Sequence, residues 1–539
     1  MAFERIVANR WVPDEELAYH LQDESRCSVD FLTSALSHLS GVTVESVAIR
    51  RDSYLDVPAD PVFGMPPHRV EDLPHFCDVV LHQHGDGGQV AEVRVWVPLA
   101  WNGRFMGTGG GGNRLTVGVL GFPSFRSSTI ATAMRNGFAT ASTDGGYGAD
   151  PRFCDWQLDP TTRELDAELI ENWAHRSTHQ MTLIGKAVTA ALYGQEPRFS
   201  YFQGCSGGGR QALAEAMYHP QDYDGIWSDA PAINWTRFIP SMGWAAVVMN
   251  ELGSLAPSKL EAFRRAAIAD FNEQEGGSRT YITHEEAHEF EASRVVGTMT
   301  ESGVITSRDA KVMQLIWEGP HSPSGERLWY GLRPGAESWG HNGAGMGACL
   351  TAYDEEGRLR PIISPVALSW FQTWILQDPE WDWTVLDRAD FARLFEIGKE
   401  KFGHISMDNP DLQPFSTEGG KILFTQGLDD ELVFPEGIQH YYNRVTASNG
   451  GREETRQFAR LFLFPGDGHG AAAYHGVGPD LATGMAALMN WVEHAIGPES
   501  LVARRFAGNG ELMETFTVRE YDPTGRKVPG HVQVDIASQ

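Results

Sequence analysis

Residues 199–217 read FSYFQGCSGGGRQALAEAM, and the pattern of this stretch indicates the fold. The apolar residues at 199–202 predict a buried strand, and the residues after Gly207 predict a helix. Between them, Gly204 to Gly208 spell the pattern G-x-S-x-G around Ser206. A serine on a tight turn between a strand and a helix presents its hydroxyl as a nucleophile. We therefore predict Ser206 as a nucleophile; the alternative is a glycine-rich turn without chemistry.

Two later strand patterns predict where the partners of Ser206 lie. Residues 421–425 (KILFT) have an apolar centre and lead to Asp430, and residues 461–464 are apolar and lead to His469. Sites in open α/β sheets gather at the carboxyl ends of strands, and the order serine, acid, histidine fits this kind of nucleophile turn. We therefore predict that Asp430 orients His469 and that His469 is the base. The competing candidates are Asp429, His440 and His475.

Strand and helix patterns alternate on both sides of the serine stretch. Strands are expected at 92–97 and 138–142, and helices at 130–136, 166–194 and 481–494. This alternation predicts an α/β fold with a mostly parallel central sheet that is covered on both faces. Together with the serine turn, it indicates an α/β-hydrolase fold.

The domain boundaries follow from a change of composition and secondary-structure pattern after residue 235. Residues 236–399 mix helical stretches with loops rich in glycine, proline and tryptophan, which predicts an inserted lid domain. The catalytic domain is then formed by residues 1–235 and 400–539, with 1–75 as a wrapped N-terminal segment. We expect a mostly irregular tail after the helix at 481–494.

The glycine run from Gly107 to Gly112 is the candidate oxyanion loop. It also fits G-x-G-x-x-G, but no clean helix and no acidic ribose partner follow, so a dinucleotide site is not expected. One backbone N–H is expected from Gly110 or Gly111 and the other from Gly207, at the start of the helix.

His284-Glu285-Glu286-Ala287-His288 matches the zinc-protease pattern H-E-x-x-H. Thr283 and Glu286 form a capping box, which makes His284 the first residue of a solvated helix. No third ligand follows. We expect no metal and no cofactor.

Composition narrows the possible partners and location. The chain has 539 residues and a formal net charge of −28, so a nucleic-acid partner is not expected. No apolar run is long enough to span a membrane, and no signal peptide is expected. The five cysteines are widely spaced, which favours free thiols and a cytoplasmic location. The oligomeric state does not follow from the sequence.

The chain resembles the tannase and feruloyl esterase family. The segments that carry the resemblance are 101–105, 142–145, 204–211, 223–226, 230–235, 419–421, 465–469 and 491–493. The resemblance implies an α/β-hydrolase domain with a large lid and the hydrolysis of esters of aromatic acids. It places the serine, aspartate and histidine of the family on Ser206, Asp430 and His469.

The chain departs from the family pattern at two places and agrees with it at a third. The family joins a cysteine before the serine to one after the histidine; here Cys205 is present but position 470 is glycine. The stretch 270–279 lacks the aspartate-rich calcium loop of the family, so no calcium is expected. Cys27 and Cys77 occupy positions where family members have cysteines, so their pairing stays open.

We therefore expect a serine ester hydrolase that acts through an acyl-enzyme on a small ester of an aromatic acid. Aromatic residues of the lid are candidates to stack on the acyl group or to form a packed lid core. They are Trp329, Tyr330, Trp339, Trp370, Phe371 and Trp374. The alternatives are lactone or carbon–carbon bond hydrolysis or acyl transfer with the same triad, a ligand-binding relative without activity, and a zinc protease.

Overall fold

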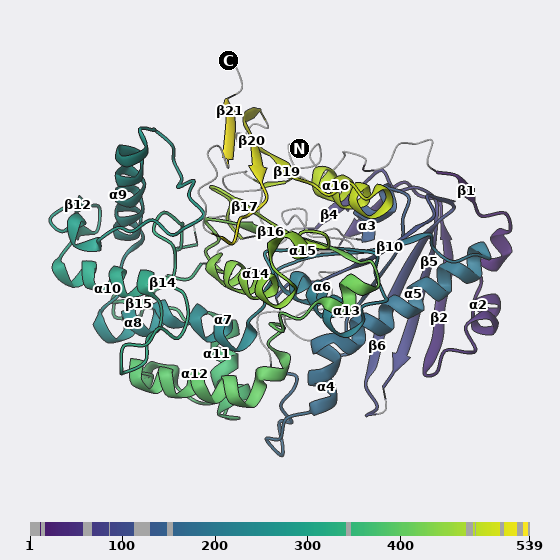
Figure 1. Ribbon diagram of the computed structural model, residues 1–539. Coiled ribbons are helices and arrows are strands. Elements are labelled where there is room, and N and C mark those ends of the chain that lie inside the picture. Colours follow the sequence, from purple (N-terminus) through teal and green to yellow (C-terminus); the bar gives the residue numbers. More distant parts are fainter. Residues whose placement is uncertain are drawn as a thin grey trace.

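A nine-stranded mixed sheet is the centre of the molecule (Figure 1). The computed structural model describes residues 11, 17–57, 67–85, 87–112, 130–147, 155–340, 347–469, 478–479, 481–506, 511–524 and 532–536. In spatial order the strands are β17 (Ala459–Phe464), β16 (Lys421–Gly427), β11 (Gly225–Asp229), β10 (Phe199–Cys205), β8 (Arg104–Thr108), β9 (Ala139–Thr143), β6 (Val90–Pro98), β5 (Phe76–His84) and β2 (Val42–Arg50).

The sheet has a parallel part and an antiparallel part. The six strands from β17 to β9 pair in parallel. β6, β5 and β2 follow in antiparallel pairs and form the long strands at one side of the sheet in Figure 1. The predicted mostly parallel sheet is confirmed, and β2 lies in a segment that was expected only to wrap around the domain.

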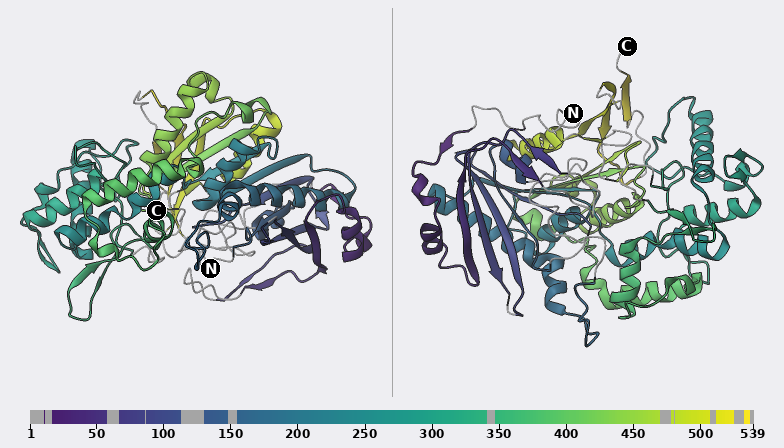
Figure 2. Two further views of the ribbon diagram at one scale, coloured as in Figure 1. Left: turned by 90° about the horizontal axis from the view of Figure 1, so that it is seen from below. Right: turned by 180° about the vertical axis from the view of Figure 1, so that it is seen from behind.

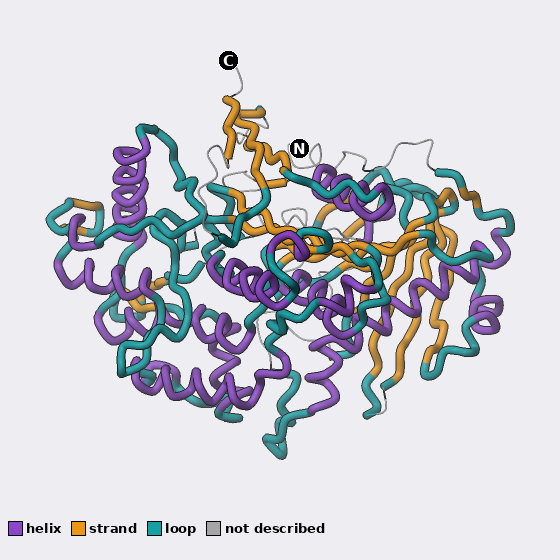
Figure 3. The backbone as a smooth tube through the Cα atoms, in the orientation of Figure 1, coloured by secondary structure: helices purple, strands orange, loops and turns teal. Residues whose placement is uncertain are grey.

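Side chains of the parallel strands alternate between two hydrophobic cores, as strand geometry requires. Phe202 and Ile226 enter one core, whereas their neighbours Tyr201 and Trp227 enter the other. The first core contains residues of the helices α5 (Ser177–Tyr193), α6 (Gly207–Tyr218) and α14 (Glu436–Ser448). The second contains residues of α3 (Ile130–Arg135) and α16 (Leu481–His494). Helices therefore cover both faces, as the tube view shows (Figure 3).

The predicted helix at 166–194 is present but is not uniform. It begins as α4 (Ala167–Glu171), passes through a π-helical turn at Asn172–Arg176 and continues as α5. α5 ends at Tyr193, and the next residue, Gly194, caps it with a left-handed conformation at φ 71°.

Residues 236–399 contribute no strand to the nine-stranded sheet within the described part of the chain. They form the helical mass at the teal end of the molecule (Figure 2). Its elements include α7 (Trp235–Met242), α8 (Trp244–Leu252), α9 (Pro257–Glu275), α10 (Ser307–Glu318), α11 (Pro365–Ser369), a π-helical turn (Trp370–Ile375) and α12 (Arg388–Phe402). At its base the N–H of Trp235 donates to the carbonyl of Ser406 at 3.0 Å. We call residues 236–399 the insertion.

The C-terminal tail differs from the expectation of an irregular segment. The strands β19 (Ser500–Phe506), β20 (Leu512–Arg519) and β21 (Val532–Ile536) pair in antiparallel fashion. Phe516 and Val518 of β20 are buried in the second core because alternate residues of this strand are apolar. The prediction of a mostly irregular tail is wrong, because the tail buries apolar residues by forming strands.

Cys27 and Cys77 form a disulfide bond. The bond ties the segment before α2 (Val29–Ala35) to the start of β5. Cys205 and Cys349 are buried thiols, and Cys154 lies outside the described residues. The expectation of free thiols is therefore wrong for Cys27 and Cys77. In the part of the chain that the structure describes, no helix combines the length and apolar character that crossing a bilayer requires.

Candidate active site

Ser206 stands on a strained turn between β10 and α6. Its backbone has φ 60° and ψ −120°, a region that residues other than glycine rarely occupy. The turn is so tight that a Cβ on Gly204 would lie 2.4 Å from the carbonyl carbon of Gly208. The glycines of this motif are therefore required by the close approach of the backbone, which leaves the serine hydroxyl at the start of the helix.

The structure brings together the three residues that the sequence predicts as a triad. The Nε2 atom of His469 lies 2.9 Å from the Oγ of Ser206, and its Nδ1 atom lies 2.8 Å from the Oδ2 of Asp430. A carboxylate only accepts hydrogen bonds, so the Nδ1 atom carries the proton. The Nε2 atom then has a lone pair directed at the serine hydroxyl, as a general base requires.

Asp430 is fully buried and held by further donors. The backbone N–H groups of Leu432 and Val433 donate to its Oδ1 at 2.9 and 2.8 Å, and the side-chain amide of Gln426 donates to its Oδ2 at 2.7 Å. Gln426 is the sixth residue of β16, so the strand itself fixes the carboxylate. Sequence reasoning did not find Gln426, because a buried glutamine in an apolar strand carries no motif.

The competing candidates lie elsewhere. Asp429 is partly exposed, and its N–H donates to the carbonyl of Asp467 at 3.0 Å. His440 lies against Tyr330, whose hydroxyl is 3.4 Å from its Nδ1. His475 is outside the described residues.

Two buried acids set the electrostatics around the histidine. Burial lowers the pKa of His469, but the charge and hydrogen bond of Asp430, with a contribution from Glu431, outweigh burial and raise it above its usual value. Glu431 is buried beside Asp430, and its Oε2 accepts the backbone N–H of His469 at 3.1 Å. Burial, and then the charge of Asp430, raise the pKa of Glu431 to about 7. Sequence reasoning overlooked Glu431.

The glycine loop packs directly on the serine turn. A Cβ on Gly207 would lie 2.3 Å from the carbonyl oxygen of Gly112, so the two segments touch through their backbones. The N–H of Gly110 donates to the Oε1 of Gln211 at 2.8 Å. Among the described residues no acceptor is found for the N–H of Gly111 or Gly207. This geometry favours Gly111 over Gly110 as the donor from the loop.

Three of the six aromatic candidates are inaccessible. At most 1% of the surface of Trp370, Phe371 or Trp374 is exposed, and all three belong to the hydrophobic core of the insertion. The ring centroids of Trp370 and Trp374 lie 5.5 Å apart. They form a packed core, as the alternative held, and offer no surface to a substrate. Tyr330 and Trp339 are partly exposed, and Trp329 is buried against His440 with ring centroids 5.6 Å apart.

The helix predicted to begin at His284 is not formed. Residues 284–291 are irregular, and the buried guanidinium of Arg333 donates to the carbonyl oxygens of His284 and Glu285 at 2.9 and 3.2 Å. Arg333 thus takes the place of the helical N–H donors. The helix that would place two histidines on one face for zinc is absent from this segment.

The counterpart of the family calcium loop does not fit calcium. The carboxylate of Asp270 already pairs with Nε2 of His288 at 2.9 Å and with Nη1 of Arg294 at 2.5 Å. Calcium requires six to eight oxygen ligands. In this segment Asp270 is the buried carboxylate that could bind calcium, and it is already paired with Arg294 and His288.

Comparisons with known proteins give the family. Residues 77–539 match the family described as "Tannase and feruloyl esterase". A "Probable feruloyl esterase" of Arthroderma benhamiae is 35% identical over 444 residues, which cover 80% of this chain and 79% of that protein. An uncharacterized esterase of Xanthomonas campestris pv. campestris is 28% identical, with 88% and 85% covered.

Solved structures show the same fold. The tannin acyl hydrolase from Aspergillus niger has a TM-score of 0.77 at 21% identity, covering 95% of this chain and 96% of that one. Feruloyl esterase B from Aspergillus oryzae has a TM-score of 0.74 at 19% identity, covering 95% and 100%. The α/β-hydrolase fold expected from the sequence is confirmed, and the chain belongs to the tannase and feruloyl esterase family.

Proposed function

We propose that this protein is a serine carboxylic-ester hydrolase that acts on small esters of phenolic acids. The observation that carries the proposal is the continuous hydrogen-bonded chain from Ser206 through His469 to Asp430, with distances of 2.9 and 2.8 Å. Family membership and relatives named as feruloyl esterase and tannin acyl hydrolase support the ester and its phenolic acyl group. They favour hydrolysis over lactone cleavage, carbon–carbon cleavage or acyl transfer.

In the first half of the reaction the Oγ of Ser206 attacks the ester carbonyl carbon while Nε2 of His469 takes its proton. The N–H groups of Gly207 and Gly111 stabilise the oxyanion of the tetrahedral intermediate. The carbon–oxygen bond to the alcohol then breaks, and His469 gives its proton to the departing oxygen. An acyl group remains on Ser206.

In the second half His469 removes a proton from water as the water oxygen attacks the acyl carbonyl carbon. The tetrahedral intermediate collapses, the bond to Ser206 breaks, and the proton on His469 returns to the serine oxygen. The carboxylic acid is released. Asp430 holds the imidazole in one tautomer and stabilises its cation in both halves.

Acid release from methyl ferulate, methyl gallate, a terephthalate monoester and p-nitrophenyl acetate tests the proposal. Wild type should cleave at least one of the aromatic esters, and Ser206→Ala should abolish the turnover. If wild type cleaves the activated p-nitrophenyl ester alone, the triad is supported but the assignment of phenolic esters as substrates is refuted. Turnover by Ser206→Ala at the wild-type rate would refute the proposal.

The cytoplasmic location stays a prediction. The disulfide between Cys27 and Cys77 weighs against it, because reducing compartments keep protein thiols reduced. Fractionation of the source cells, with the thiols alkylated before lysis, would report location and disulfide together.

A further inference from the structure

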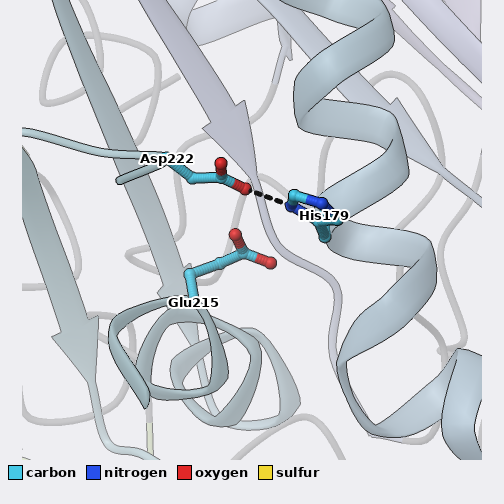
Figure 4. A group of neighbouring side chains, drawn as sticks. All are labelled: His179, Glu215 and Asp222. Carbon is cyan, nitrogen blue, oxygen red and sulfur yellow. Dashed lines mark hydrogen bonds and ion pairs between the residues drawn. The ribbon is translucent and has the colours of Figure 1, made fainter. Parts of the chain in front are cut away.

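A second group of functional side chains lies at the far end of the nucleophile helix. His179 comes from α5, Glu215 from the last turns of α6, and Asp222 from the loop that leads to β11 (Figure 4). One ligand atom from each residue lies within 4.8 Å of the other two. Glu215 is nine positions after Ser206, which separates the group from the serine by about 13 Å along the helix.

Glu215 is the unusual member of this group. Its side chain is fully buried, and neither carboxylate oxygen receives an N–H or O–H donor. It points toward Asp222 and His179 (Figure 4). Burial, and then the negative charge of Asp222, raise the pKa of Glu215 well above its usual value. Two buried carboxyl groups in contact require a positive charge between them, which a proton or a cation can supply.

Among the described residues no basic group donates a hydrogen bond to Glu215, whereas Asp222 pairs with His179. The amine of Lys186 donates to the backbone carbonyl of Asp222. The imidazole of His179 stacks on that of His219 with ring centroids 3.8 Å apart, and its Nδ1 lies 2.6 Å from the Oδ2 of Asp222. The stacking fixes the ring so that one nitrogen faces both carboxylates. A shared proton would account for two of these side chains. A metal ion accounts for all three, because each contributes one ligand atom to the same cluster.

We propose that His179, Glu215 and Asp222 bind one divalent cation of the zinc class. One imidazole nitrogen and two carboxylate oxygens are a donor set that zinc accepts, with a fourth position left for water. The side chain of His179 is 28% exposed, which gives the ion a path from solvent. The ion would link α5, α6 and the entry to β11. Because the ion would lie far from Ser206 along α6, it would take no part in the ester reaction, and this proposal is independent of the esterase activity.

The test uses the full chain without a polyhistidine tag, stripped with chelator and titrated with Zn²⁺. Wild type should bind one Zn²⁺ per chain with release of protons, because the ligands must deprotonate. Its melting temperature should rise with Zn²⁺ concentration. Co²⁺ in place of zinc should give visible absorption bands that report the ligand geometry.

The ligand variants are His179→Gln and Glu215→Gln, and each should weaken Zn²⁺ affinity at least tenfold. The matched control is His82→Gln, which removes a histidine outside this group that pairs with Glu45 at 3.2 Å. It should bind zinc as wild type does. Glu215→Gln keeps the size of the side chain. If a variant does not fold, the Co²⁺ spectrum of wild type tests whether the bound ion has histidine and carboxylate ligands. Less than about 0.1 Zn²⁺ bound per chain, or equal binding by His179→Gln, overturns the proposal and leaves a shared proton between Glu215 and Asp222.

Discussion

The carboxylate of Glu431 accepts the backbone N–H of His469 at 3.1 Å, so two acids of adjacent sequence hold the same histidine. Asp430 contacts the imidazole and Glu431 contacts the main chain. Because the two acids share one buried space, the protonation of Glu431 is coupled to that of His469.

Replacing Glu431 with glutamine should move the acidic limb of kcat/KM to lower pH. The base must be neutral to act, and the anion of Glu431 stabilises the imidazolium. Removing that charge lowers the pKa of His469, so activity persists further into acid. The measurement is a pH profile of kcat/KM for wild type and variant. An unchanged or alkaline-shifted limb would show that Glu431 does not act on the histidine.

Asp430→Asn should reduce kcat by roughly 10⁴-fold, because the amide offers a donor to Nδ1 and selects the wrong tautomer of His469. Asp429→Asn is the control, since Asp429 is partly exposed and hydrogen-bonds through its backbone to Asp467. Steady-state kinetics on an aryl ester measures both. If the Asp429 variant lost more activity than the Asp430 variant, the assignment of the acid would be reversed.

Gly207→Ala should lower kcat by about 10²-fold or more with little change in KM. The added methyl would lie 2.3 Å from the carbonyl oxygen of Gly112 and would displace the loop that carries Gly111. Gly403→Ala is the matched control, because its Cβ meets no atom within 4 Å. A wild-type kcat for Gly207→Ala would exclude this loop from transition-state stabilisation.

Replacing both Cys27 and Cys77 with serine should lower the free energy of unfolding by up to about 4 kcal/mol. The bond closes a loop with a sequence separation of 50, whose entropy in the unfolded chain sets this magnitude. Activity at room temperature should persist, because the disulfide is remote from the triad in sequence and Cys77 lies in the antiparallel part of the sheet. Chemical denaturation with and without reductant measures the effect. A reductant that destabilises the double variant as much as wild type would disprove the mechanism.

The parts of the fold that sequence predicted well are those with local signals. The turn around Ser206, the strands that lead to Asp430 and His469, and the helix at 481–494 each show a periodicity or motif within a short window. Gln426 and Glu431 could not be predicted, because a single polar residue carries no motif and His469, the partner of Glu431, is distant in sequence. The roles of these residues follow from their tertiary contacts and not from a local sequence pattern.

The capping box at Thr283 shows the opposite failure, a local signal overruled by the tertiary structure. The pattern predicts a helix, but Arg333 binds the carbonyl oxygens of 284 and 285 and fixes an irregular path. The same limit applies to the group of His179, Glu215 and Asp222. Its members span three segments with no common spacing, so only the packing of α5 against α6 reveals it.

The hydrogen bond between Trp235 and Ser406 joins the two chain segments that flank the insertion. β11 and β16 are neighbours in the sheet, yet the whole insertion separates them, so pairing them first would close a very long loop at high entropic cost. We expect the insertion to fold first and bring its two ends together, which leaves the strands a short effective connection. Ser206 leaves the ribosome long before His469, so a nascent chain stays catalytically silent until β16 and β17 emerge and join the sheet.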